Sequence, residues 1–279
     1  MFAAMANSSR TAGEHLRDWR QRRRMSQLEL ALEAGISPRH LSFLETGRAQ
    51  PSREMVLRLA GFLEVPIRER NVLLVAAGYA PVFPVRSLDD PALEAARKAI
   101  DLVLESQKPY PAFALDRHWQ IAASNSALPE LYVGVKPELL ARPLNAMRLS
   151  LHPEGLAPRI VNLAEWRAHL LARLRHQVEL TADPALAELL REVSGYPAPE
   201  ASAAEHAAAE HSVIVPLSIR TEVGVLSFLS TTTVFGTPVD VTLSELAMEL
   251  FFPADAATAE AVRRLAARSA EPKRAVAAA

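Results

Sequence analysis

The sequence has no cysteine, which excludes disulfide bonds and thiolate metal sites. No apolar run approaches the ~18 residues that cross a bilayer, and the start, MFAAMANSSR, lacks the basic and apolar segments of a secretion signal. The patterns G-x-S-x-G, G-x-G-x-x-G and the P-loop are also missing. We therefore expect a cytoplasmic protein that does not contact a membrane, with no catalytic residues, no cofactor and no enzymatic activity.

Lysine is missing from the first 80 residues, which hold 12 arginines and 8 acidic residues. This segment has a net charge of +4, whereas the full chain has a net charge of −1. Arginine forms planar, paired hydrogen bonds with phosphates and guanine edges, which lysine cannot do. The excess of arginine fits a surface that binds nucleic acid, but an ordinary solvated helical surface explains it equally well. A sequence motif has to decide between these two interpretations.

Capping patterns divide residues 11–80 into five short helices. Ser26 and Glu29 form an S-x-x-E capping box, and Gly35 ends the helix that follows it. Ser37 caps the next helix. Helices this short bury their apolar faces only by packing together, so we expect an all-α, five-helix domain.

The rest of the chain predicts a second domain of mixed structure over residues 89–268. We expect a helix at 91–107, two short strands joined by a turn at Asp116–His118, and mostly helical structure over 137–194. The closing strands are HSVIVPLSI, VLSFLSTTTVF and the segment around LAMELFF, followed by a helix near 256–268. These strands are too closely connected for crossover helices, so they should be antiparallel. The predicted fold class is α+β in two domains.

Three segments are expected to lack helices and strands. They are residues 1–10, the low-complexity stretch PAPEASAAEHAAAEH, which we expect to form a surface loop, and the tail EPKRAVAAA.

Two capped helices joined by AGIS predict a helix-turn-helix. The turn needs a residue that tolerates positive φ at Gly35 and an apolar plug at Ile36. In this motif the second helix lies in the major groove of double-stranded DNA, with its N-terminal residues at base edges. The N-terminus of the first helix attracts a phosphate. Leu41 and Leu44 then face inward, and Phe43 faces outward.

The rotation of the second helix predicts the DNA contacts. Arg39 is expected to pair with a guanine, and Phe43, one turn later, to lie against a thymine methyl group. Phe43 covering a neighbouring helix stays open as the alternative. The full predicted DNA-binding set is Gln27, Ser37, Arg39, His40, Ser42, Phe43, Arg48 and Arg53. One such motif makes few contacts, so we also expect a homodimer on two half-sites.

The segment SQLELALEAGISPRHLSFLETGRAQPS resembles the helix-turn-helix of the phage-repressor (XRE) class, over residues 14–77. The segments LDRHWQIAASN, LHPEGLAPRIVNLAEWRAHLLARL and TLSELAMELFFPAD resemble the MmyB-like ligand-binding domain. This resemblance implies a PAS-like sheet and small-molecule sensing, with fatty acid-like ligands as a candidate class. Pro38 and Phe43 stand where many XRE proteins have polar base readers, so no operator sequence can be carried over.

Ligand pockets are mostly apolar with a few placed polar groups, and an acidic ligand favours an arginine or a helix N-terminus. The residues of this kind near the resembling segments are Asn125, Arg148, His152, Asn162 and Trp166. The alternative stays open for each: Trp166 in the core, His152 and Asn162 hydrogen-bonded to loops, and Arg148 exposed.

Histidines do not predict a metal site. His169 and His176 are seven residues apart, not at the i, i+4 spacing of a zinc helix, and His206 and His211 lie in the low-complexity stretch. A second hypothesis makes the mixed domain a protein-interaction module or a degenerate enzyme, with the helical domain as a tether. A catalytic triad or a metal cluster would favour the enzyme, and the sequence shows neither.

Overall fold

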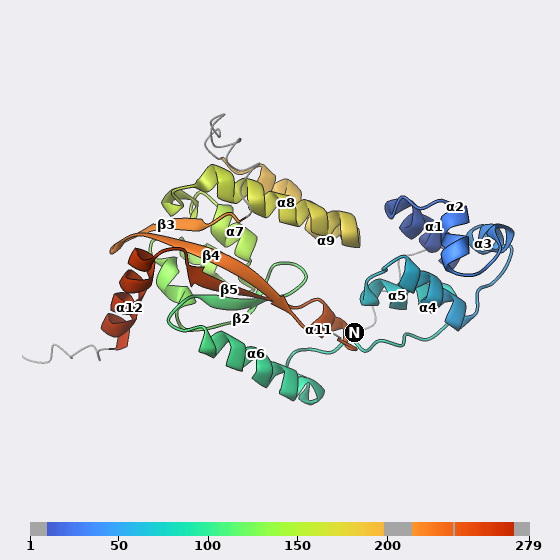
Figure 1. Ribbon diagram of the computed structural model, residues 1–279, viewed down its shortest axis with the longest axis horizontal. Coiled ribbons are helices and arrows are strands. Elements are labelled where there is room, and N and C mark those ends of the chain that lie inside the picture. Colours follow the sequence, from blue (N-terminus) through green and yellow to red (C-terminus); the bar gives the residue numbers. More distant parts are fainter. Residues whose placement is uncertain (1–9, 198–213, 237, 271–279) are drawn as a thin grey trace, which may run out of the picture. The chain divides into compact units, whose positions relative to one another are not determined.

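The computed structural model describes residues 10–197, 214–236 and 238–270 (Figure 1). The predictions for residues 1–9, for nearly all of the low-complexity stretch and for the tail therefore lie outside the described residues. By its internal contacts the chain forms two compact units. The first unit consists of Met1–Ser87, Glu179–Thr181 and Thr237–Ser244, and the second of Leu88–Val178, Ala182–Gly236 and Glu245–Ala279. The domain bounds 11–80 and 89–268 stay a prediction.

Five helices build the N-terminal part of the first unit, residues 12–76, which confirms the predicted all-α domain. They are α1 (Ala12–Arg22), α2 (Gln27–Glu33), α3 (Pro38–Glu45), α4 (Arg53–Phe62) and α5 (Ile67–Ala76). The capping box of Ser26 and Glu29 is formed, and Ser37 caps α3 through the N–H of His40. Local capping chemistry therefore sets the helix starts that the sequence indicated.

The core of the first unit consists mainly of leucine and alanine side chains from all five helices. Helix α1 crosses the end of α3 at Gly13, where a β-carbon would lie 2.3 Å from the carbonyl oxygen of Leu44. Only glycine permits this approach, because real β-carbons essentially never come within 3.0 Å of such an atom.

A buried ion pair joins α1 to α3. Arg20 donates from Nε and Nη2 to the two carboxylate oxygens of Glu45, at 2.7 and 3.0 Å, and from Nη1 to the carbonyl of Met25 at 2.8 Å. Gln27, the first residue of α2, donates to Glu45 at 2.8 Å. The two ends of the pair are thus almost fully hydrogen-bonded, and the pair fixes three helix ends together.

The chain after α5 is held by side chains of the same unit. Asn71, which is buried, accepts from the N–H groups of Val82 and Phe83 and donates to the carbonyl of Phe83. Helix α11 (Val241–Ser244) meets the next residues: Val241 N–H donates to the carbonyl of Pro84, and Arg86 pairs with the buried Asp240 at 3.0 Å.

A five-stranded antiparallel sheet is the centre of the second unit, with the order β2-β1-β5-β4-β3. The strands are β1 (Ala112–Leu115), β2 (Ile121–Ser124), β3 (Leu217–Thr221), β4 (Gly224–Val234) and β5 (Ala247–Pro253). The antiparallel prediction is confirmed. Strand β3 starts later than HSVIVPLSI predicted, since residues 214–216 lie outside it. The physical reason is Pro216, which has no N–H to donate to a ladder of strand hydrogen bonds.

Helices cover both faces of this sheet (Figure 1). Helix α6 (Glu94–Ser106) packs Ile100 and Leu104 against Ala112, Ala114 and Met248 on one face. The other face is covered by a larger apolar cluster to which α7 (Ala146–Leu151), α8 (Leu163–Thr181), α9 (Pro184–Ser194) and α12 (Ala256–Ala270) contribute. The described part of the unit also has short 3-10 helices: η1 (Pro91–Leu93), η2 (Leu128–Tyr132), η3 (Pro137–Leu140) and η4 (Ala157–Arg159).

The region predicted as mostly helical, 137–194, has long helices only from Leu163 onward. Along α8 the expected stripe is inward, with Trp166, Leu170 and Leu174 buried. Among the described residues, no helix is both long and apolar enough to span a bilayer.

Candidate functional site

Helix α3 separates its apolar and polar side chains in the way the sequence indicated. Leu41 and Leu44 are buried at 0 and 1% exposure, whereas Arg39 and His40 are exposed. The turn before α3 places Gly35 at φ +59°, a conformation that favours glycine. Rotation of α3 about its own axis is therefore fixed by its core contacts, and a basic surface is left outward.

Phe43 lies on that outer surface, between two guanidinium groups. The Cζ atoms of Arg39 and Arg48 are 5.3 and 5.9 Å from the centre of its ring. Phe43 is only half-buried and does not belong to the core cluster of the first unit. Each cation–π contact at an exposed site contributes about 0.5–1 kcal/mol. The aromatic ring thus orders two arginines of the predicted DNA-binding set on one face.

The structure gives several other members of this set a local partner. Ser37 is exposed and accepts from the N–H of His40 at 3.1 Å, so its hydroxyl caps α3. Gln27 is held by Glu45, as described above. Ser42 is half-buried, and its carbonyl accepts from the hydroxyl of Thr46. Arg53 is exposed at the first position of α4.

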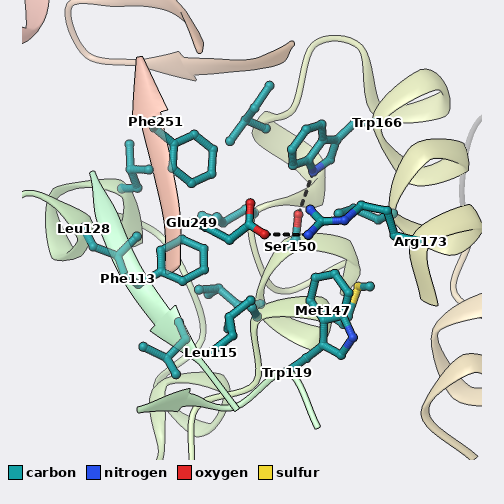
Figure 2. Close-up of a pocket in the computed structure, with 17 residues that line it drawn as sticks. Phe113, Leu115, Trp119, Leu128, Met147, Ser150, Trp166, Arg173, Glu249 and Phe251 are labelled. Carbon is teal, nitrogen blue, oxygen red and sulfur yellow. Dashed lines mark hydrogen bonds and ion pairs between the residues drawn. The ribbon is translucent and has the colours of Figure 1, made fainter. Parts of the chain in front are cut away.

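A largely apolar cavity lies in the second unit, on the sheet face covered by α7 and α8 (Figure 2). Its empty volume, about 610 Å³, includes space that is open to solvent. Rings of Phe113 and Phe251 from neighbouring strands form one wall, with Leu128 beside Phe113, and Met147 lies near Trp119 on the opposite side. Such a lining favours an apolar or amphipathic molecule.

Two tryptophans line the cavity, and each has its indole N–H hydrogen-bonded. Trp166 donates to the hydroxyl of Ser150 at 2.9 Å, and Trp119 donates to Gln177 at 2.7 Å. Trp119 has φ +64°, a left-handed conformation that costs a non-glycine residue about 1–2 kcal/mol. The Asp116 side chain stabilises this turn by accepting from the N–H groups of His118 and Gln120. The turn therefore aims an aromatic ring at the cavity.

One ion pair stands in the largely apolar wall. Arg173 of α8 donates from Nη2 to Oε1 of Glu249 of β5 at 2.5 Å, and the Thr232 hydroxyl donates to the same oxygen at 2.9 Å. Arg173 also lies over the ring of Trp119, at 5.0 Å from its centre. Burial, followed by the charge of Arg173, lowers the pKa of His169, so this neighbour adds no positive charge near pH 7. Figure 2 shows the pair among the aromatic rings.

Trp166 lines the cavity, while the other four predicted ligand residues lie outside its lining. Asn125 is buried and makes four hydrogen bonds to backbone groups. Its amide group donates to the carbonyls of Leu104 and Tyr110 and so joins the segment after β2 to α6 and to the chain before β1. Asn162 accepts from the N–H of Ser218 and donates to the carbonyl of Pro216.

Arg148 and His152 belong to a cluster on the surface between α7 and α9. Arg148 forms a double hydrogen bond with Glu192 at 2.8 and 2.7 Å. His152 meets the ring of Tyr196 edge-on at 4.9 Å, and Tyr196 donates to Glu192 at 2.5 Å. Burial, then the hydrogen bond to Glu192, raises the pKa of Tyr196 to about 12. These contacts join α7 to α9, so the cluster acts as a structural link between the two helices.

Sequence reasoning missed Trp119, Arg173 and Glu249. Glu249 offered a detectable pattern, because it is the one charged residue in LAMELFF, a segment that otherwise reads as a buried strand. Arg173 has no comparable pattern, since it lies in an arginine-rich helix among solvated neighbours. Within the described ranges, no three His, Asp or Glu side chains gather to hold a metal ion. His206 and His211 lie outside those ranges.

Comparison with known families gives two matches. Residues 96–265, more than half of the chain, match the MmyB-like transcription regulator ligand binding domain, and residues 16–70 match a helix-turn-helix family. A relative from Bacillus subtilis (strain 168), the uncharacterized HTH-type transcriptional regulator RghRB, is 36% identical over 73 residues. That match covers 26% of this chain and 50% of the relative, so the chain spans about half the length of the relative.

Proposed function

Because the chain belongs to the MmyB-like transcription regulators, with a helix-turn-helix before the ligand-binding domain, we propose that α3 reads the sequence of double-stranded DNA. The observation that carries this is the outward face of α3, where Phe43 holds Arg39 and Arg48 while the leucines of the same helix are buried. Arg39 pairs with a guanine, Phe43 contacts a thymine methyl, and Arg48 and Arg53 neutralise phosphates.

Selection from a random double-stranded DNA library tests this proposal with the full chain. We expect enrichment of one sequence, and loss of that enrichment for Arg39→Ala. The matched control is Arg58→Ala, which removes an arginine from α4 that belongs to none of the proposed contacts. Enrichment that is unchanged by Arg39→Ala would show that α3 does not read bases in this way.

For the cavity, we propose sensing of a small apolar or amphipathic molecule, in a domain of PAS-like type. Fatty acids are the candidate class implied by the family resemblance. The alternative, a protein-interaction module or degenerate enzyme without a ligand, does not require the apolar cavity with two tryptophans and a charged pair. Mass spectrometry of molecules extracted from purified protein, with a binding screen of lipids, separates the two. No bound molecule and no binder would favour the interaction module.

We propose that the protein acts as a homodimer in the cytoplasm, on the bacterial nucleoid. Two copies double the base contacts of a single α3 and read two half-sites. Sedimentation of the full chain with and without a selected duplex tests this form. A monomer on each duplex would contradict it.

We propose that α11 carries the ligand state to the first unit. Helix α11 contacts Pro84 and Arg86 and then leads along the chain directly into β5, which bears Glu249. Asp240→Ala removes the ion pair with Arg86 and the side-chain acceptor at the start of α11. The change should leave DNA affinity without ligand near its starting value and abolish the ligand effect on it. A retained ligand effect would contradict this route.

A further inference from the structure

The ion pair in the cavity wall leaves part of each partner unused. Every hydrogen bond that Arg173 makes within the described ranges starts from Nη2, and the bonds to Glu249 from Arg173 and Thr232 both end at Oε1. Arg173 Nε and Nη1, and Glu249 Oε2, make no hydrogen bond to a residue in the described ranges. Both side chains line the cavity. The cavity wall therefore offers donors from Arg173 and an acceptor from Glu249.

The charge of the pair restricts what these groups can bind. The Glu249 side chain is 4% exposed and already neutralises Arg173. His169, four residues before Arg173 on α8, has a lowered pKa and supplies no compensating charge near pH 7. A carboxylate ligand on Arg173 would bring a second negative charge beside Glu249 in a poorly hydrated site, and an uncompensated buried charge is costly.

From this geometry, and resting on the proposed ligand-sensing role, we infer that the cavity selects an acyl or alkyl compound with an uncharged head group. The head group accepts from Arg173 and donates to Glu249, as a primary amide, a hydroxyl or an undissociated carboxylic acid does. Glu249 is then the residue that discriminates against anions. The aliphatic part of the molecule lies among Phe113, Leu128 and Phe251.

Decanamide and decanoate test this inference because they differ only in replacing an NH₂ group with a negatively charged oxygen. Calorimetric titration of the full chain, at about pH 8, where a carboxylic acid is ionised, gives both affinities. We expect decanamide to bind about tenfold or more tightly than decanoate. In Glu249→Gln the order should reverse, because Arg173 then has an unneutralised charge. Thr232→Val keeps both charges and should keep the wild-type order.

The outcomes separate this inference from the sensing role on which it rests. Tighter binding of decanoate than of decanamide by the wild-type chain overturns the selection by charge, and the sensing role stands. If Glu249→Gln leaves the ratio of decanamide to decanoate affinity unchanged, selection by charge is likewise overturned and the sensing role stands. Binding of neither compound, nor of any other in the lipid screen, overturns both. The wild-type comparison needs no substitution, so it decides the matter even where a variant fails to fold.

Discussion

In the described part of each unit an arginine pairs with a buried glutamate, and the two pairs differ in how completely they are hydrogen-bonded. In the first unit, Arg20 uses three nitrogens and Glu45 both oxygens, with side-chain exposures of 10 and 1%. In the second, Arg173 uses one nitrogen and is 29% exposed. A fully bonded pair fixes helices, whereas a partly bonded pair in a cavity wall keeps groups available for a ligand.

The largest expected effect is the loss of stability when the fully hydrogen-bonded pair, Arg20–Glu45, is broken. Glu45→Ala leaves Arg20 buried without its partner, which costs about 3–5 kcal/mol. Glu249→Ala should cost less, because Arg173 remains partly accessible to water. Hydrogen exchange followed by mass spectrometry reports the free energy of opening for each unit separately. Equal losses in the two units would mean that the pairs have the same structural role.

The next prediction concerns the basic face of the first unit. Arg39→Ala should weaken binding to the selected duplex by about 1–3 kcal/mol and relax the preference at one base pair. Arg48→Ala serves as the matched control, and it should weaken binding to all sequences alike and lower the salt dependence by roughly one ion. Gel-shift titrations at several salt concentrations measure both quantities. Similar behaviour of the two variants would assign Arg39 to phosphate contacts.

A smaller effect is expected for Phe43. Phe43→Ala removes the ring between two arginines but no core contact, so the free energy of unfolding should fall by about 1–2 kcal/mol, the sum of two exposed cation–π contacts. Preference at a single base position should relax. Denaturant unfolding and duplex selection measure the two effects. A loss of about 3–5 kcal/mol, typical of a core phenylalanine, would place Phe43 in the core.

The smallest effect concerns the surface cluster of the second unit. Hydrogen bonds from Arg148, opposed by partial burial, lower the pKa of Glu192 below its ordinary value of 4.5. Its contribution to stability is therefore present above pH 4.5 and is lost as pH falls through the lowered folded-state pKa. The effect should stay below about 1 kcal/mol, because both side chains are partly exposed. Melting temperatures between pH 6 and about 3 test this, and Glu192→Gln should abolish this part of the pH dependence.

Patterns local to the chain predicted the first unit well. Capping boxes, the proline at the start of α3 and the glycine of the turn each depend on a few neighbouring residues. The burial of Leu41 and Leu44 follows from helical spacing. The outward position of Phe43 follows from the same spacing, but its contacts with two arginines required the structure.

The cavity was much less predictable. Of the five candidate ligand residues, Trp166 lines it, whereas Asn125, Arg148, His152 and Asn162 have partners elsewhere. The charged residues of its wall come from α8 and β5, and the Thr232 hydroxyl that bonds to both comes from β4; these elements are far apart in sequence. No periodicity can show which polar side chains of distant elements meet, because their meeting depends on strand register and helix packing.

The sequence by itself determined the helix-turn-helix, the antiparallel character of the closing strands and the two-part α+β architecture, because capping, turn residues and connection lengths act locally. The tertiary structure decided which charges are neutralised. Arg20 and Arg173 are both arginines on helices with apolar stripes. One meets the end of α3 and the other meets a strand in a cavity wall, since only folding brings Glu45 and Glu249 to them.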